Sequence, residues 1–88
     1  MLGKFYKLLD LLVNNGYTVN FFEEYMEGII IENAIVENEN YYIDITTEDV
    51  FIEITVTIAN KEEYETIEIK KYKNIKSAFN YIKKYIED

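Results

Sequence analysis

The chain has 88 residues, with 17 acidic against 9 basic side chains, a formal net charge of −8, and no His or Cys. This length predicts one domain over residues 1–88 with a single modest core. Without His or Cys, histidine-based triads, thiolate nucleophiles and metal sites with nitrogen or sulfur ligands are excluded. The lack of Cys also fits a reducing, cytoplasmic setting.

A helix is predicted at residues 2–14, where apolar residues recur at three- and four-residue steps. Its apolar stripe consists of Leu2, Phe5, Leu8, Leu9, Leu12 and Val13. Asn15 and Gly16 follow as a C-terminal cap, because Gly accepts the left-handed conformation that ends helices. Charged residues interrupt the stretch, so we expect no signal peptide, and no apolar run approaches the ~20 residues that cross a bilayer.

Strand-forming residues dominate the middle of the chain, at 17–21, 28–36, 41–46, 50–58 and 64–70. The run 50–58 is expected to be the longest strand. Residues 21–27 (FFEEYME) remain open between a helical turn and a wide connection. Loops of four or five residues suit hairpins, so the strands should form an antiparallel meander of four or five strands.

A second helix is predicted at the other end of the sequence, with Asn74 as its N-cap. Its stripe consists of Ile75, Ala78, Phe79, Ile82 and Ile86. Two amphipathic helices need an apolar surface to cover, and the sheet offers one. The expected fold is therefore α+β, with the N-terminal and C-terminal helices packed on one face of the meander.

Alternation along the strands predicts which side chains face the helices. The inward set is Tyr41, Ile43, Ile45, Val50, Ile52, Ile54, Val56, Ile58, Ile67 and Ile69. The opposite set is Tyr42, Asp44, Phe51, Glu53, Thr55, Thr57, Tyr64, Thr66 and Glu68. An antiparallel sheet can leave such a second face in water.

Charge is distributed unevenly along the chain. Residues 20–69 hold fourteen carboxylates and one lysine, whereas the last nineteen residues sum to +4. A negative field of this size repels nucleic acid and membrane phosphates and attracts basic surfaces. The plain alternative is a solvated face whose charges keep strand edges from aggregating.

Catalysis is not expected. Ser77, the single serine, falls inside the second predicted helix, and the three glycines are too far apart for a phosphate-binding loop. The acidic runs match no calcium loop, and a sheet with two helices leaves little material for a glycosidase cleft. We therefore predict no enzyme, no cofactor and no metal.

A binding protein with an acidic recognition surface remains. The candidate partner-binding residues are Tyr42, Asp44, Glu48, Asp49, Phe51, Glu53, Tyr64 and Glu68. Tyr gives a large contact area with few rotors, although packing alone could also explain these tyrosines. Duplex DNA carries one charge per ~1.7 Å, whereas same-face residues on a strand recur only every ~6.7 Å. Mimicry of nucleic acid would thus need carboxylates from several strands.

The general layout resembles the small acidic phage-encoded inhibitors, of which anti-CRISPR proteins are the best-known group. The shared features are an N-terminal helix, a YTV segment after an Asn-Gly cap, an acidic meander and a closing helix. The lysines of the final helix depart from that pattern. The resemblance implies a stoichiometric inhibitor that occupies the basic surface of a host nucleic-acid-binding protein, such as a Cas effector.

A structural or accessory subunit is the alternative hypothesis. It would form homodimers or larger homo-oligomers through edge strands, or through contact between an acidic and a basic surface of two copies. Ile, Asn, Lys and Tyr supply 14, 9, 9 and 9 residues, a bias expected of an AT-rich genome.

Overall fold

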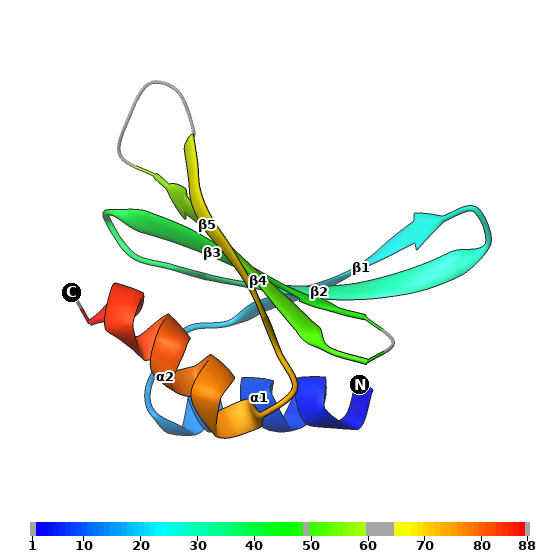
Figure 1. The fold of residues 1–88 in the computed structure, drawn as a ribbon, viewed down its shortest axis with the longest axis horizontal. Coiled ribbons are helices and arrows are strands. Elements are labelled where there is room, and N and C mark those ends of the chain that lie inside the picture. Colours follow the sequence, from blue (N-terminus) through cyan, green and yellow to red (C-terminus); the bar gives the residue numbers. More distant parts are fainter. Residues whose placement is uncertain (1, 49, 60–64, 88) are drawn as a thin grey trace.

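A computed structural model describes residues 2–48, 50–59 and 65–87 of the chain. Two helices lie on one face of a twisted five-stranded sheet (Figure 1). The elements in chain order are α1 (Leu2–Asn14), β1 (Asn20–Met26), β2 (Ile29–Glu37), β3 (Tyr41–Thr47), β4 (Ile52–Ile58), β5 (Glu65–Tyr72) and α2 (Ile75–Ile86). The α+β fold predicted from the sequence is confirmed.

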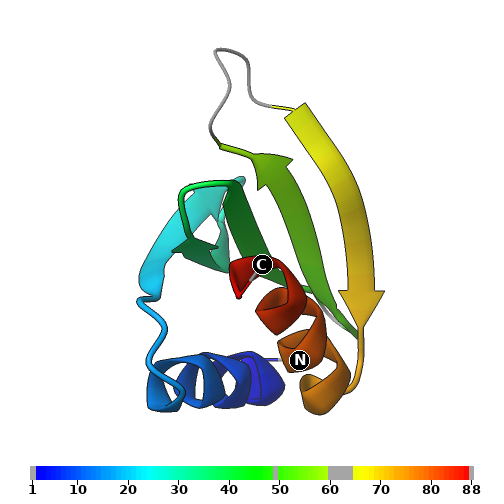
Figure 2. The same cartoon turned by 90° about the vertical axis from the view of Figure 1, so that its left-hand side faces the viewer.

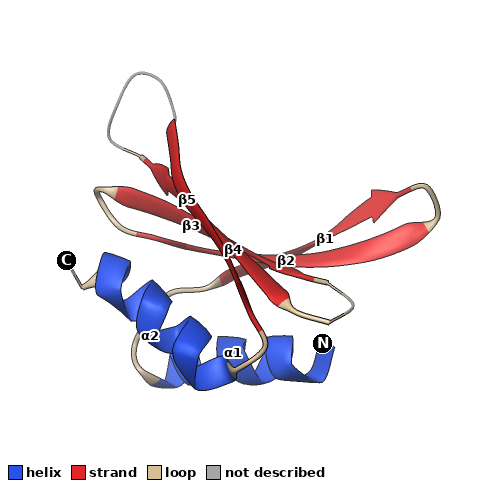
Figure 3. Ribbon diagram, in the orientation of Figure 1, coloured by secondary structure: helices blue, strands red, loops and turns tan. Residues whose placement is uncertain are grey.

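The sheet is an antiparallel meander in the order β1-β2-β3-β4-β5. Each strand pairs with its neighbour in sequence. Figure 2 shows both helices on the same side of the sheet, with β1 and β5 at its two edges. Colouring by secondary structure separates the helical layer from the sheet (Figure 3).

The core lies between the helices and the centre of the sheet. Fully buried side chains come from α1, β2, β3, β4 and α2; the largest are Phe5, Leu8, Leu12, Val36, Ile43, Ile45, Ile52, Ile54, Val56 and Ile82. Most of the predicted stripe of α1 is buried, but Val13 is 55% exposed because it lies at the margin of the stripe. In α2, Tyr81 is buried as well, although it was not expected in the stripe.

Both predicted caps are present. At the end of α1, the Gly16 N–H donates to the Val13 carbonyl at 3.0 Å and the Tyr17 N–H donates to the Leu12 carbonyl at 3.1 Å. Gly16 has φ +88°, the left-handed conformation that this Schellman-type ending requires. At the start of α2, the Asn74 side chain accepts a hydrogen bond from the Ser77 N–H at 3.0 Å.

Asn38, in the β2–β3 turn, joins that turn to the last turn of α2. Its side-chain nitrogen donates to the carbonyls of Tyr85 and Ile86 at 3.2 and 3.1 Å. Its side-chain oxygen accepts from the N–H groups of Asn40 and Tyr41 at 2.8 and 2.7 Å. One amide therefore binds two carbonyls of the last helical turn, which have no following turn of helix to donate to them.

Residues 21–27, left open by the sequence, belong to β1 and its turn. Glu27 and Gly28 both have positive φ, at 50° and 81°, and form a two-residue hairpin loop between β1 and β2. Two positive φ angles are the mark of a type I′ turn, whose twist matches that of the strands. The predicted strand at 17–21 is therefore wrong in position, since β1 begins at Asn20.

The prediction that 50–58 is the longest strand is also wrong. β4 has 7 residues and β2 has 9. The Glu48 N–H donates to the Phe51 carbonyl at 2.9 Å, so the β3–β4 turn takes up Val50 and Phe51. Val50, predicted to face the core, is 58% exposed.

In β5, Glu68 and Ile69 lie on the opposite faces of the sheet from those predicted. A register shift at Val56/Thr57 places Glu68 opposite Val56, which is fully buried, and Ile69 opposite Thr55. A β-bulge adds one residue to one strand and so reverses the alternation beyond it. Ile67 and Ile69, predicted to point inward, are 41% and 55% exposed.

No helix among the described residues is long and apolar enough to cross a membrane.

Candidate binding surface

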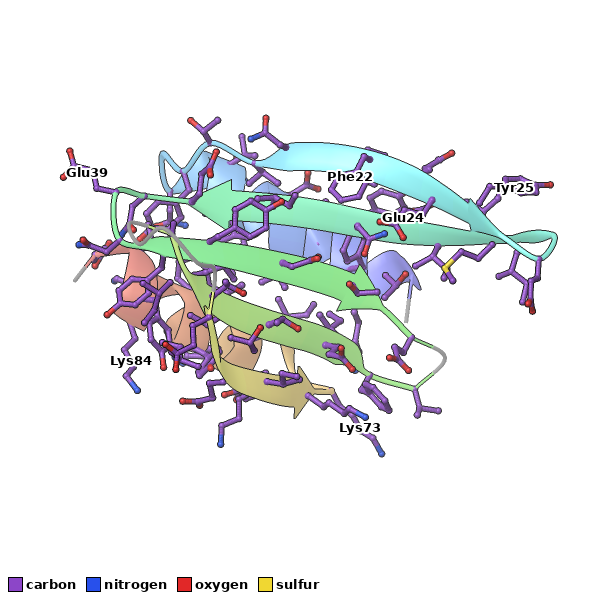
Figure 4. The ribbon with its side chains drawn as sticks, turned by 90° about the horizontal axis from the view of Figure 1, so that it is seen from above. Phe22, Glu24, Tyr25, Glu39, Lys73 and Lys84 are labelled. Carbon is purple, nitrogen blue, oxygen red and sulfur yellow. The ribbon has the colours of Figure 1, made fainter. Side chains whose placement is uncertain are left out.

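The sheet has an inner face, turned toward the helices, and an outer face, turned away from them. Figure 4 views the outer face, with the helices behind the sheet. Strand pairing assigns to the outer face Phe22, Glu24, Met26, Ile29, Ile31, Asn33, Ile35, Glu37, Tyr42, Asp44, Thr46, Glu53, Thr55, Thr57, Thr66, Ile69 and Lys71. No helix in the described part of the chain covers this face.

Apolar side chains border the outer face. On β1 and β2, Phe22, Ile31 and Ile35 are half-buried, whereas Met26 and Ile29 are 55% and 64% exposed. On the opposite border, β5 contributes Ile69, which is 55% exposed, and the half-buried ring of Phe51 lies beside Lys71. An exposed apolar patch bordered by polar residues is a usual mark of a protein-binding surface.

A polar group occupies the centre of the outer face. The Thr46 hydroxyl donates to Asn33 Oδ1 at 2.7 Å, and Asn33 is buried. The same hydroxyl lies 3.4 Å from Asp44 Oδ1. Desolvation raises the pKa of Asp44, the Thr46 hydrogen bond lowers it, and the charge of Glu24 raises it further. The charged form of Asp44 is therefore held in an unfavourable site.

Glu53 and Phe51 both interact with a basic side chain of β5. Lys71 Nζ lies 4.0 Å from Glu53 Oε2 and 4.5 Å from the centroid of the Phe51 ring. The side chains of Lys71 and Glu53 are both partly exposed to solvent, so their ion pair adds little to the stability of the fold. A partner could replace Lys71 as the neighbour of Glu53 with little loss of free energy.

Four of the eight predicted binding residues lie on the outer face: Tyr42, Asp44 and Glu53 by strand pairing, and Phe51 by its contact with Lys71. Tyr42 is opposite Thr57, at the other end of β4 from Glu53 and Phe51. Glu48 is exposed in the β3–β4 turn beside them. Asp49 and Tyr64 lie outside the described residues.

The predicted position of Glu68 is wrong, because this residue lies on the inner face. The Tyr85 hydroxyl donates to Glu68 Oε2 at 3.1 Å, and Lys70 Nζ lies 3.7 Å from Glu68 Oε1. The nearby hydroxyl of Tyr81, then that of Tyr85, lowers the pKa of Glu68. The Tyr81 hydroxyl is buried, with no partner of standard geometry among the described residues. Glu68 thus helps to hold α2 on the sheet.

The carboxylates are divided between the two faces, contrary to the expectation that one face carries them. Glu23 and Glu32 are opposite each other on the inner face. Hydrogen bonding to Glu32 raises the pKa of Tyr6 in α1 to about 12. The outer face has four strand carboxylates, those of Glu24, Glu37, Asp44 and Glu53. It is therefore a mixed apolar and acidic surface.

The apolar border on β1 and β2 was missed by sequence reasoning. The residues concerned lie on either side of Glu27 and Gly28. A glycine at the second position of a two-residue loop, with β-branched residues after it, would have indicated this hairpin. Reading residues 21–27 as a strand would then have placed Phe22 and Met26 beside Ile29 and Ile31.

No protein-family model matches the chain, and comparisons with curated proteins and with solved structures also find no match. The function must therefore be inferred from the molecule itself. Within the described residues, no group of three or more acidic, His or Cys side chains is placed to hold a metal ion. The outer face provides exposed apolar and aromatic side chains that a partner could contact, together with the negative charge of four strand carboxylates.

Proposed function

We propose that this protein is a non-enzymatic binding domain whose outer face docks on a basic surface of another protein. The observation that carries the proposal is the sheet face that no described helix covers, on which apolar and aromatic side chains border a polar centre that contains Asp44 and Glu53. Protein interfaces commonly combine apolar and aromatic contact area with a limited number of hydrogen bonds and charged groups. The net charge of −8 would also speed encounter with a basic partner.

The proposal extends to the kind of partner, a protein with a basic surface that binds nucleic acid. A basic surface that binds nucleic acid would suit the negative field, as in the inhibitor role that the layout resembles. The protein would then be a phage-encoded or mobile-element-encoded inhibitor of a host defence protein, such as a Cas effector. The division of carboxylates between the faces favours apolar docking with charge steering over close copying of the DNA backbone.

The test uses two variants with the same change in charge. D44N/E53Q neutralises the outer face, and E27Q/E39Q neutralises two exposed turn carboxylates away from its centre. Proteins captured from a lysate of an AT-rich bacterium would be identified, purified and titrated against all three forms. We expect one partner to bind wild type and E27Q/E39Q alike and D44N/E53Q roughly tenfold more weakly.

Salt and competing duplex DNA test whether the partner is a nucleic-acid-binding protein. Release of the partner by both would support a nucleic-acid-binding target, whereas release by salt alone would support a basic protein of another kind. A partner that binds D44N/E53Q as well as it binds wild type would refute the outer face as the docking surface. Failure of every purified candidate to bind the wild-type protein would also refute it.

A further inference from the structure

The two edge strands of the sheet carry opposite charges at corresponding positions. β1 and β5 stand at the two ends of the strand order. In an edge strand, every second residue directs its N–H and C=O away from the sheet, where another strand can pair with them. Each edge is therefore a template for an added strand.

On β1, two adjacent glutamates lie between two aromatic residues. The sequence from Phe22 to Tyr25 is Phe-Glu-Glu-Tyr. Strand pairing places Glu23 on the inner face and Glu24 on the outer face. Both glutamates are exposed, and Tyr25 is 75% exposed. The edge thus shows one carboxylate to each side of the sheet.

On β5, two adjacent lysines lie between two apolar residues. The sequence from Ile69 to Tyr72 is Ile-Lys-Lys-Tyr. Lys70 is opposite Ile54 and so lies on the inner face, whereas Lys71 is opposite Glu53 on the outer face. Their side chains are 52% and 55% exposed, and their ion pairs within the chain, at 3.7 and 4.0 Å, are long.

These two edges match each other when β5 of one copy lies beside β1 of another. An antiparallel meander of five strands makes β1 and β5 run in the same direction. Two copies with their helices on the same side would then pair the edges in parallel. In one register the charges match on both faces: Glu23 meets Lys70 on the inner face, and Glu24 meets Lys71 on the outer face.

The flanking residues match in the same register. Phe22 meets Ile69 on the outer face, and Tyr25 meets Tyr72 on the inner face. Cross-strand pairs of opposite charge, and aromatic pairs with β-branched or aromatic residues, stabilise sheets. Four consecutive pairs are therefore favourable together.

Pairing of β1 with a second β1 is unfavourable by comparison. The antiparallel register that pairs all 7 residues of β1 would place Glu23 opposite Glu23 of the other copy. Like charges directly opposite each other destabilise a sheet. The edges select against the symmetric contact and for the β1 to β5 contact.

We infer that copies of this protein associate head to tail, β5 of one beside β1 of the next, through these four pairs. A contact of this kind is heterologous, so it can extend into an open chain of copies. The inference uses the sheet edges and does not depend on the docking role proposed for the outer face, although Phe22, Glu24, Ile69 and Lys71 lie at the borders of that face.

Charge reversal provides the test, measured by sedimentation velocity over a wide range of protein concentration. The weight-average sedimentation coefficient of wild type should rise with protein concentration, because copies associate. E23K/E24K alone and K70E/K71E alone should remain monomeric, because each has edges of like charge. An equimolar mixture of the two should associate again, since each variant then meets an opposite edge.

Matched variants control for net charge. E37K/E39K changes the net charge by the same amount as E23K/E24K, and K76E/K83E by the same amount as K70E/K71E, and all four residues are exposed away from the two edges. Both controls should associate as wild type does. The outer-face variant D44N/E53Q should associate at least as strongly as wild type, because E53Q releases Lys71 from its ion pair with Glu53. This result separates the inference from the proposed function.

Cysteine pairs test the register, because the chain has no cysteine of its own. In the proposed register, F22C/I69C places the thiols on the same face of adjacent strands, and oxidation should yield a ladder of covalent oligomers. F22C/K70C places them on opposite faces and should yield none. Wild type that stays monomeric at every concentration, or a mixture that does not associate although both variants are folded, would overturn the inference.

Discussion

The centre of the sheet and the far end of the β1–β2 hairpin contain similar residues in different surroundings. At the centre, Ile45 and Ile54 are fully buried beneath the helices. At the hairpin end, Ile29 and Ile30 are 64% and 53% exposed. Isoleucine content is therefore a poor guide to burial in this protein. Cover by the helices determines where apolar residues stabilise the fold and where they remain available for contact.

The largest expected effect separates these two regions directly. Ile54→Ala should lower the free energy of unfolding by about 3 kcal/mol, because it leaves a cavity in a closely packed core. Ile30→Ala should lower it by less than about 1 kcal/mol, since the side chain is already half in water. Urea unfolding followed by circular dichroism measures both. Equal losses would show that the hairpin end is buried in solution.

A smaller effect is expected in the hairpin loop. Glu27 has φ 50°, a left-handed conformation that Asn adopts more readily than Glu. Glu27→Asn should therefore raise the free energy of unfolding by up to about 1 kcal/mol. Glu39→Asn removes the same charge from an exposed turn without a positive φ and serves as the control. A matching gain in both variants would indicate charge relief instead of turn geometry.

The smallest effect is a pH dependence at the centre of the outer face. Desolvation is the main cause of the raised pKa of Asp44. A carboxyl with a raised folded-state pKa contributes stability below its unfolded pKa, and this contribution is lost as pH rises through the folded value. Asp44→Asn should thus be more stable than wild type at neutral pH, by no more than about 1 kcal/mol. The difference should vanish well below the ordinary carboxyl pKa of about 3.9.

For Glu68, the stability difference between variant and wild type should depend on pH with the opposite sign. The hydroxyls of Tyr81 and Tyr85 lower its pKa, so its contribution is present above the unfolded pKa and is lost as pH falls through the folded value. Glu68→Gln should therefore be less stable than wild type at neutral pH, and the difference should shrink in acid. Thermal unfolding at a series of pH values measures both variants. Parallel curves for the two variants would contradict the opposite pKa shifts of Asp44 and Glu68.

Both helices could be predicted from the sequence because their apolar residues keep a helical period and their caps are local. Gly16 and Asn74 act within a few residues of themselves. The faces of β3 and of the paired part of β4 were equally predictable, since Ile43, Ile45 and Ile54 alternate with polar residues.

The face of β5 could not be predicted, because it depends on a bulge opposite Val56 and Thr57. A single added residue moved Glu68 to the inner face and Ile69 to the outer face. In the candidate surface, Tyr42, Asp44, Phe51 and Glu53 were predictable from the alternation of β3 and β4. The contribution of Phe22 was not, since it required the hairpin turn at Glu27 to be recognised first.

The contact between α1 and α2 has a consequence for the kinetics of folding. The five strands pair with neighbours in sequence, so the sheet can assemble from short loop closures. The helices instead come from opposite ends of the sequence, and the Lys4 side chain donates to the Lys73 carbonyl at 3.0 Å across that separation. We therefore expect helix docking to be the slow, long-range step of folding. Until docking occurs, the isoleucines of the inner face would be exposed to other chains, so the time that docking takes should set how long the folding protein is vulnerable to aggregation.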